Sequence, residues 1–320
     1  MKKKPKILVV GSLSMDLFCS TPRFPKSGET IIGTTFYTAP GGKGANQAVQ
    51  AARLGADVTM VGKIGEDDFG NQIKKSLSNS GINTDLIFNS LTCSTGVANI
   101  QLEVSQSGTA NRILVLPGAN MDLIEKDVEC LHKTISSYDM VMLQLEIPMS
   151  INILVAEIAK KSGIPVMLNS APSAPLPDRL LTCLDFISPN EHEAYDMTGV
   201  EIRDYSSATR AIQCLHQKGV KNVLITMGKK GAIFSNGKEV FSSPCVDYAP
   251  VVDPTAAGDS FVAAFCVAVC LGYQPESALL IANHTAGITV SRMGAQPSLP
   301  LLGEVIEFME KNGCNVFVNN

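Results

Sequence analysis

Short apolar runs alternate with amphipathic stretches along most of the chain. The runs cover residues 6–10, 57–61, 140–145, 165–168, 186–187 and 223–226. Apolar runs of this length, each followed by a helical pattern, are typical of parallel strands that are buried on both faces of a sheet. The pattern therefore predicts an α/β fold in which helices flank a doubly wound, mainly parallel sheet.

Two other stretches follow a different pattern. Residues 97–104 alternate apolar and polar, a turn is expected at 105–108, and the strand returns through 113–116. Residues 17–19 and 31–37 have a similar character. A period of two indicates antiparallel strands with one solvated face, so we expect a small β-sheet lid over the ends of the parallel strands. The predicted division is a core of 1–16, 39–95 and 118–312, a lid of 17–38 and 96–117, and a C-terminal tail of 313–320.

Polar side chains follow several of the predicted parallel strands. They are Asp16, Glu146, Asn169, Asn190 and Thr226. One polar residue at a strand end is ordinary turn chemistry. Ligands of doubly wound sheets bind outside the carboxyl ends of the strands, so five such residues predict a binding site at this edge.

A loop of small residues, Asp-Pro-Thr-Ala-Ala-Gly-Asp-Ser at 253–260, runs into an apolar segment at 261–271. This pattern predicts the start of a buried helix, where unpaired N–H groups attract an anion. A carboxylate at Asp259 would repel a resting phosphate. Its position favours a base that takes a proton from a hydroxyl attacking a phosphorus held by the amides of Ala256, Ala257 and Gly258. The structural alternative is that Thr255 caps the helix and Asp259 complements its dipole.

A second glycine-rich segment, Pro-Gly-Gly-Lys-Gly-Ala-Asn-Gln at 40–47, opens another predicted helix that ends near Gly55. Its glycines allow close approach of the backbone to a ligand. Lys43 and Asn46 add donors that suit a polyhydroxylated molecule or a phosphate. Neither a Walker A motif nor a dinucleotide-binding glycine motif is present, so nucleotide phosphates would be held by another architecture.

Length and charge narrow the classes of protein. The chain has 320 residues, a formal net charge of -4 and a pI near 5.6. The length predicts about two domains' worth of mass, and the acidic balance argues against nucleic acid or an anionic membrane as a partner. No apolar run approaches the roughly 18 residues of a membrane span, and the first run is too short for a signal peptide, so we expect a cytoplasmic protein.

Cysteine and histidine supply no evident chemistry. The nine cysteines include no Cys-x-x-Cys pair, and Cys266 and Cys270 share one helical face without a nearby histidine. Free thiols that pack in the core are the expected state. The four histidines are scattered, and none has a nucleophile and an orienting acid nearby in the sequence.

The two glycine-containing segments, in this order and separation, resemble those of ribokinases in the PfkB-type carbohydrate kinase family. The similarity runs from Val9-Val10-Gly11-Ser12 to Gly294-Ala295-Gln296-Pro297-Ser298. The resemblance implies ATP-dependent phosphorylation of D-ribose at its 5-hydroxyl, with Asp259 as the base. It also implies dependence on Mg²⁺ and K⁺, and a homodimer that pairs through the lid.

The resemblance also assigns roles to individual residues. Those implied to contact the sugar are Ser14, Asp16, Gly41, Gly42, Lys43, Asn46, Glu146 and Asp259. Those implied on the nucleotide side are Asn190, Glu193, Thr226, Gly228, Gly231, Gly258 and Asn283, with Asn190 and Glu193 linked to Mg²⁺ through water. Those implied to surround K⁺ are Asp253, Thr255, Thr289, Arg292, Gly294 and Ser298.

Alternatives stay open within and outside this class. Many ribokinases have asparagine where this chain has Ser14, which makes deoxyribose the nearest competitor of ribose. A deoxyribokinase or a nucleoside kinase is the alternative within the family. The alternative from another class is a non-catalytic, sugar-binding regulatory protein on a kinase fold, against which the intact Asp259 and Gly-Gly-Lys-Gly segment argue.

Overall fold

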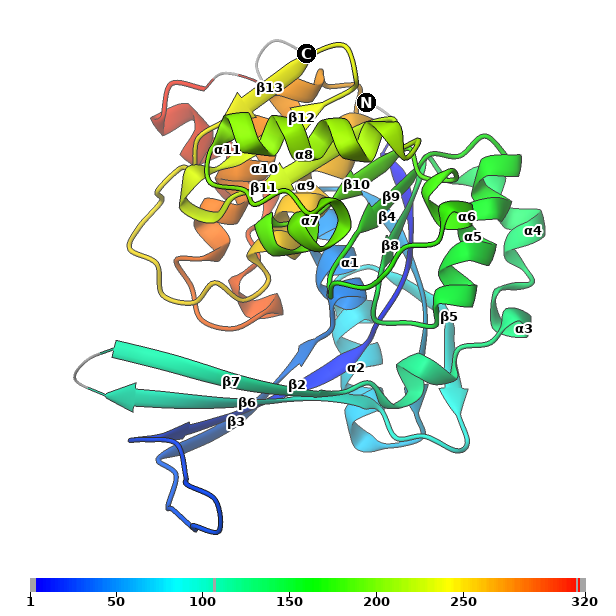
Figure 1. Ribbon diagram of the computed structural model, residues 1–320. Coiled ribbons are helices and arrows are strands. Elements are labelled where there is room, and N and C mark those ends of the chain that lie inside the picture. Colours follow the sequence, from blue (N-terminus) through cyan, green and yellow to red (C-terminus); the bar gives the residue numbers. More distant parts are fainter. Residues whose placement is uncertain (1–3, 106–107, 315, 317–320) are drawn as a thin grey trace.

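A computed structural model describes residues 4–105, 108–314 and 316, and it places the apolar runs in one large sheet (Figure 1). Its strand order is β13-β12-β11-β10-β9-β8-β1-β4-β5, in which β12 runs antiparallel to both of its neighbours and the other described strands are parallel to one another. The bounds are β1 Lys6–Val10, β4 Asp57–Gly65, β5 Asn83–Ser90, β8 Met140–Gln144, β9 Val166–Asn169, β10 Phe186–Ser188, β11 Asn222–Thr226, β12 Ala232–Ser235 and β13 Val240–Ser243.

Helices cover both faces of this sheet. Alternate residues of β1 point to opposite faces, so that Ile7 and Val9 join one core cluster and Leu8 and Val10 join the other. The first face is covered by α1 Lys43–Arg53, α2 Asp68–Asn79, α9 Ala257–Cys270, α10 Pro275–Thr289 and α11 Leu302–Lys311. The second is covered by α3 Glu125–Val128, α4 Leu131–Thr134, α5 Met149–Lys161, α6 Asp178–Leu181, α7 Glu191–Thr198 and α8 Tyr205–Gln217. The predicted doubly wound α/β fold is thereby confirmed.

A second, four-stranded sheet extends away from this body (Figure 1). Its order is β3-β2-β6-β7, with bounds β2 Ser14–Thr21, β3 Thr35–Gly41, β6 Gly96–Ser105 and β7 Gly108–Leu116. It has a small core of its own that includes Phe18, and the ring of Phe18 stacks on that of the more exposed Tyr37 with centroids 4.6 Å apart. Because β3 ends at Gly41 and α1 begins at Lys43, the glycine-rich segment joins the second sheet to a helix that covers the large one.

The structure departs from the predicted elements in two places. A strand was predicted from residue 31, but β3 begins only at Thr35, since β2 ends at Thr21 and leaves no partner for residues 31–33. Strands β5, β12 and β13 were not predicted at all. The centre of the predicted turn at 105–108 and most of the predicted tail lie outside the described residues.

None of the described helices is long and apolar enough to span a membrane.

Candidate active site

A cavity of about 800 Å³ lies between the carboxyl edge of the large sheet and the second sheet. Its lining includes all five polar residues that follow the predicted strands: Asp16, Glu146, Asn169, Asn190 and Thr226. The second sheet contributes apolar side chains, namely Ala98, Ile100, Ile113 and Val115. The loop at 254–259 completes the lining.

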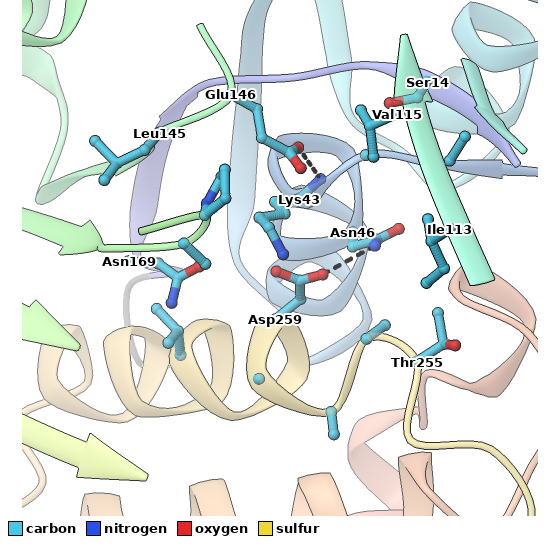
Figure 2. Close-up of a pocket in the computed structure, with 18 of the residues that line it drawn as sticks. Ser14, Lys43, Asn46, Ile113, Val115, Leu145, Glu146, Asn169, Thr255 and Asp259 are labelled. Atoms are coloured by element: carbon cyan, nitrogen blue, oxygen red, sulfur yellow. Dashed lines mark hydrogen bonds between the residues drawn. The ribbon is translucent and has the colours of Figure 1, made fainter. Parts of the chain in front are cut away.

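Asp259 lies in the first turn of α9 and is buried against the start of α1. Both of its carboxylate oxygens accept hydrogen bonds from side-chain amides. Asn46 Nδ2 donates to Oδ2 at 2.9 Å, and Gln47 Nε2 donates to Oδ1 at 3.1 Å. Lys43 extends from the same end of α1 toward the carboxylate (Figure 2). The carboxylate is therefore held in one orientation at the wall of the cavity.

The loop that precedes α9 is not capped in the way its sequence allows. Thr255 was one candidate for the cap, but the N-cap position is Ala256, and the Thr255 hydroxyl donates to Asp253 Oδ1 at 2.6 Å. Ala256 has φ of 61°, in the left-handed region that costs a residue with a side chain roughly 1 to 2 kcal/mol. The Ala257 amide, one of the three that were predicted to bind an anion, donates to the Pro254 carbonyl at 3.2 Å in this conformation.

The Glu146 carboxylate is fixed beside the first turn of α1 by two hydrogen bonds. Its Oε2 accepts from the Lys43 amide at 3.2 Å and from the Ser12 hydroxyl (Figure 2). Gly42 precedes the helix with φ of 90°, and a Cβ there would lie 2.9 Å from the Ser14 amide. Only glycine fits this position, because the conformation and the space both exclude a side chain. Gly41 lies just outside the cavity lining.

Acidic groups dominate the electrostatics of the cavity. Burial raises the pKa of Asp16 to about 7, and the nearby charges of Glu146 and Asp259 contribute to the rise. Burial alone would lower the pKa of Lys43, but attraction to these carboxylates outweighs it and the pKa is raised. Lys43 is therefore positively charged, and the Asp16 carboxylate in the same cavity can bind or release a proton near neutral pH.

The predicted nucleotide residues fall into two groups. Asn190 and Glu193 form a capping box at the start of α7, with the Asn190 amide donating to Glu193 Oε2 at 3.0 Å, and both residues line the cavity with Thr226. Burial raises the pKa of Glu193. The second group, Gly228, Gly231 and Asn283, lies outside the lining, and Asn283 Nδ2 donates to the carbonyls of Ser243 and Pro244.

The predicted cation residues surround the loop before α9. Asp253 joins this loop to the one after α10, because its Oδ1 accepts from the Thr255 amide at 2.9 Å and its Oδ2 accepts from the Gly294 amide at 2.9 Å. The hydroxyls of Thr289 and Ser298 donate to main-chain carbonyls, and Arg292 pairs with Glu304. Among the described residues, no group of three His, Cys, Asp or Glu side chains could hold a metal ion. Any cation here would depend largely on main-chain oxygens.

Two residues of the site were absent from the sequence prediction. Gln47 contacts Asp259 directly, and Gln144 Nε2 donates to Gln47 Oε1 at 2.7 Å. The available signal was modest: Gln47 belongs to the glycine-rich segment, and Gln144 interrupts the apolar run of β8. A polar residue inside a strand that is buried on both faces indicates a specific partner.

Comparisons with known proteins agree with this geometry. The pattern of the pfkB family carbohydrate kinases matches residues 4–302. A ribokinase of Haemophilus influenzae is 41% identical over 95% of this chain and 98% of its own, and a deoxyribokinase of Salmonella typhi is 34% identical over 96% and 99%. The structure of Arabidopsis thaliana ribokinase complexed with ribose and ATP superposes with a TM-score of 0.88 at 36% identity, covering 96% of this chain and 99% of that one.

Proposed function

Because the chain belongs to the pfkB family of carbohydrate kinases, we propose that it transfers the γ-phosphoryl group of ATP to the 5-hydroxyl of D-ribose. The products are ribose 5-phosphate and ADP. The observation that carries this proposal is the position of Asp259, a buried carboxylate at the start of α9 that faces a polar cavity. A carboxylate at this position is better suited to act as a general base than to bind an anion.

The residues present account for the chemistry. Asp259 takes the proton of the attacking hydroxyl, and the N-terminal amides of α9 with Lys43 stabilise charge on the transferred group. Asp16 and Glu146 accept from sugar hydroxyls and orient the acceptor for in-line attack. The apolar residues of the second sheet exclude water from the cavity, which makes that sheet a lid in this proposal.

Mg²⁺ and K⁺ belong to the proposal because the donors present suit them. Glu193 and Asn190 are oxygen donors beside the cavity, which is the chemistry that Mg²⁺ prefers. The loops joined by Asp253 bring together Thr255 and Gly294 for a cation held by main-chain oxygens. Bound there, the ions supply positive charge that lowers the repulsion between the phosphates and the acidic cavity.

An assay of acceptors tests the proposal. ADP release should be measured with ribose, deoxyribose, fructose and several nucleosides at equal concentration. Ribose is expected to give the highest kcat/KM. Turnover with none of these acceptors would contradict the kinase proposal and favour a sugar-binding regulatory role.

We expect activity to depend on K⁺ at fixed ionic strength. A cation between the loops at 253–255 and 292–298 would hold the start of α9 in place, and Ala256 in its left-handed conformation needs such support. Rates should therefore be higher in K⁺ than in Na⁺ or a bulky organic cation. Equal rates in all three salts would show that no such ion acts here.

Ser14→Asn is expected to shift acceptor preference toward ribose. Ser14 lines the cavity beside Gly42, and an asparagine reaches further toward a hydroxyl than serine does. One added hydrogen bond of about 1 kcal/mol would raise the ratio of kcat/KM for ribose over deoxyribose about fivefold. Measuring both sugars on both proteins gives this ratio, and an unchanged value would remove position 14 from the recognition of the 2-hydroxyl.

The second sheet also supports a homodimer. Ile113 and Val115 line the cavity, so the alternate residues Leu114 and Leu116 point to the opposite face, where they are 64% and 52% exposed. Phe36 is 66% exposed on β3 of the same sheet. Apolar side chains on an exposed sheet favour burial, and pairing with a second copy of the lid would cover them.

A further inference from the structure

A chain of buried amides leads from the large sheet to Asp259. Gln144, in β8, donates from Nε2 to Gln47 Oε1 at 2.7 Å, and Gln47 donates from Nε2 to Asp259 Oδ1 at 3.1 Å. The Gln47 amide also reaches Asn169 Oδ1 at 3.4 Å, and Asn169 in turn donates to the Ser188 carbonyl. Gln47 and Gln144 are both fully buried. The chain thus spans the ends of β8, β9 and β10.

The orientation of the Gln47 amide follows from its neighbours. An ionised carboxylate only accepts hydrogen bonds, so the side of Gln47 that faces Asp259 must be its NH₂ group. Its oxygen then faces Gln144, whose NH₂ group satisfies it. If Gln144 could not donate, the Gln47 oxygen would lose its partner, and the weaker contact with Asn169 would be left to oppose rotation of the amide. Gln144 therefore acts on Asp259 only through Gln47.

Gln47 differs in position from the residues that meet the sugar. Asn46 and Lys43 line the cavity, whereas Gln47 lies behind Asp259, outside the lining. A change at Gln47 should therefore affect the carboxylate without removing a contact with the acceptor. This separation makes the role of Gln47 measurable.

We propose that Gln47 is a positioning residue for Asp259, and that Gln144 sets the direction of the Gln47 amide. The proposal rests on the kinase reaction described above. Gln47 is held by Gln144 of the large sheet and fixes one oxygen of the Asp259 carboxylate. The other oxygen accepts from Asn46 and stays at the cavity wall.

Other charged groups surround the carboxylate and must be held constant in a test. They are Lys43 on α1, Asp16 on β2, Glu146 after β8, Glu193 on α7 and Asp253 in the loop before α9. Gln47→Leu leaves all of them in place. A loss of turnover in that variant consequently reports the lost donor.

The test compares Gln47→Leu with Gln50→Leu. Gln50 is also fully buried on α1, but its Nε2 donates to the Pro300 carbonyl at 3.0 Å and not to Asp259. The measurements are kcat at saturating ribose and the Kd for ribose by calorimetry. For Gln47→Leu, we expect kcat to fall about tenfold, because the Asp259 carboxylate loses one of the two donors that orient it. The Kd for ribose should change less than about twofold.

A double variant tests the role of Gln144. Gln144→Leu alone should lower kcat less than Gln47→Leu does. Gln47→Leu with Gln144→Leu should lose no more kcat than Gln47→Leu, because Gln144 acts through Gln47. Additive losses of kcat would show that Gln144 reaches Asp259 by another route and would overturn its part of the proposal.

Three results would overturn the role of Gln47: an unchanged kcat, a loss of ribose affinity as large as the loss of kcat, or an equal loss of kcat in Gln50→Leu. If Gln47→Leu is too unstable to assay, Gln47→Glu keeps the side-chain volume while replacing the donor with a repelling charge, and kcat should again fall while the Kd for ribose changes less than about twofold. Failure of the wild-type protein to phosphorylate any sugar would instead contradict the kinase function, so the two failures are distinguishable.

Discussion

Asp259→Asn is expected to abolish turnover while leaving ATP binding intact. Loss of a general base costs roughly 10² to 10⁴ in rate. The substitution keeps the side-chain volume, but the amide cannot take the proton of the acceptor hydroxyl. Measuring kcat by ADP release and the Kd for ATP by calorimetry separates chemistry from binding.

A matched control makes this result specific. Asp57→Asn changes an exposed aspartate at the start of β4, the end of the strand away from the cavity, and should keep wild-type turnover. If Asp259→Asn retained more than about a third of the wild-type kcat, a residue other than Asp259 would have to act as the base.

Asp16→Ala should lower kcat/KM for ribose about tenfold to a hundredfold and leave the KM for ATP nearly unchanged. Asp16 is buried at the start of the second sheet, within the cavity. Its loss leaves a sugar hydroxyl unpaired in a closed site, which costs on the order of 1 to 3 kcal/mol. An equal increase in the KM for ATP would show that the substitution disturbs the whole site. That result would contradict a contact specific to the sugar.

The pH dependence of ribose use should identify the same residue. Because the pKa of Asp16 is raised to about 7, the side chain is largely protonated below that pH and ionised above it. The ionised form is the better acceptor for two hydroxyls, so kcat/KM for ribose should rise as pH increases through about 7. Asp16→Ala should lack this rise, and identical profiles for the two proteins would refute the assignment.

The sequence predicted the large sheet well because its central strands are buried on both faces. Runs such as that of β1 are apolar after their first residue and stand out against the amphipathic helices. Strands β12 and β13 have only four residues each, and the solvated residues of β13 blur its apolar pattern. Residues 31–33 carry a strand-like composition without a partner strand, and pairing is a property of the folded chain that local pattern does not contain.

The sequence predicted that the site lies at the carboxyl edge of the large sheet, but it predicted fewer of the contacts within the site. The rule that parallel strands meet ligands at their carboxyl ends is enough to place Glu146 and Asn190 at one site from the sequence alone. The hydrogen bond between Gln47 and Asp259 joins residues 212 positions apart, which no local motif reveals. Asn46 was expected to meet the sugar, yet its amide nitrogen donates to Asp259, and its buried oxygen has no partner among the described residues. The orientations of the Gln47 and Asn46 side chains both follow from the packing of α1 against α9.

The two walls of the cavity differ in how freely they can vary during evolution. The wall on the large sheet is crowded to the backbone: a Cβ at Gly44 would lie 2.6 Å from the Ser12 amide, so even alanine would displace α1. The wall on the second sheet consists of apolar side chains such as Ile113 and Val115, which are half exposed and lie on β7, whereas Asp259 and its amide partners lie on helices. Mutations there can reshape the space above the acceptor at little cost in stability. New acceptors can therefore arise by drift in the second sheet while the residues around Asp259 are inherited unchanged.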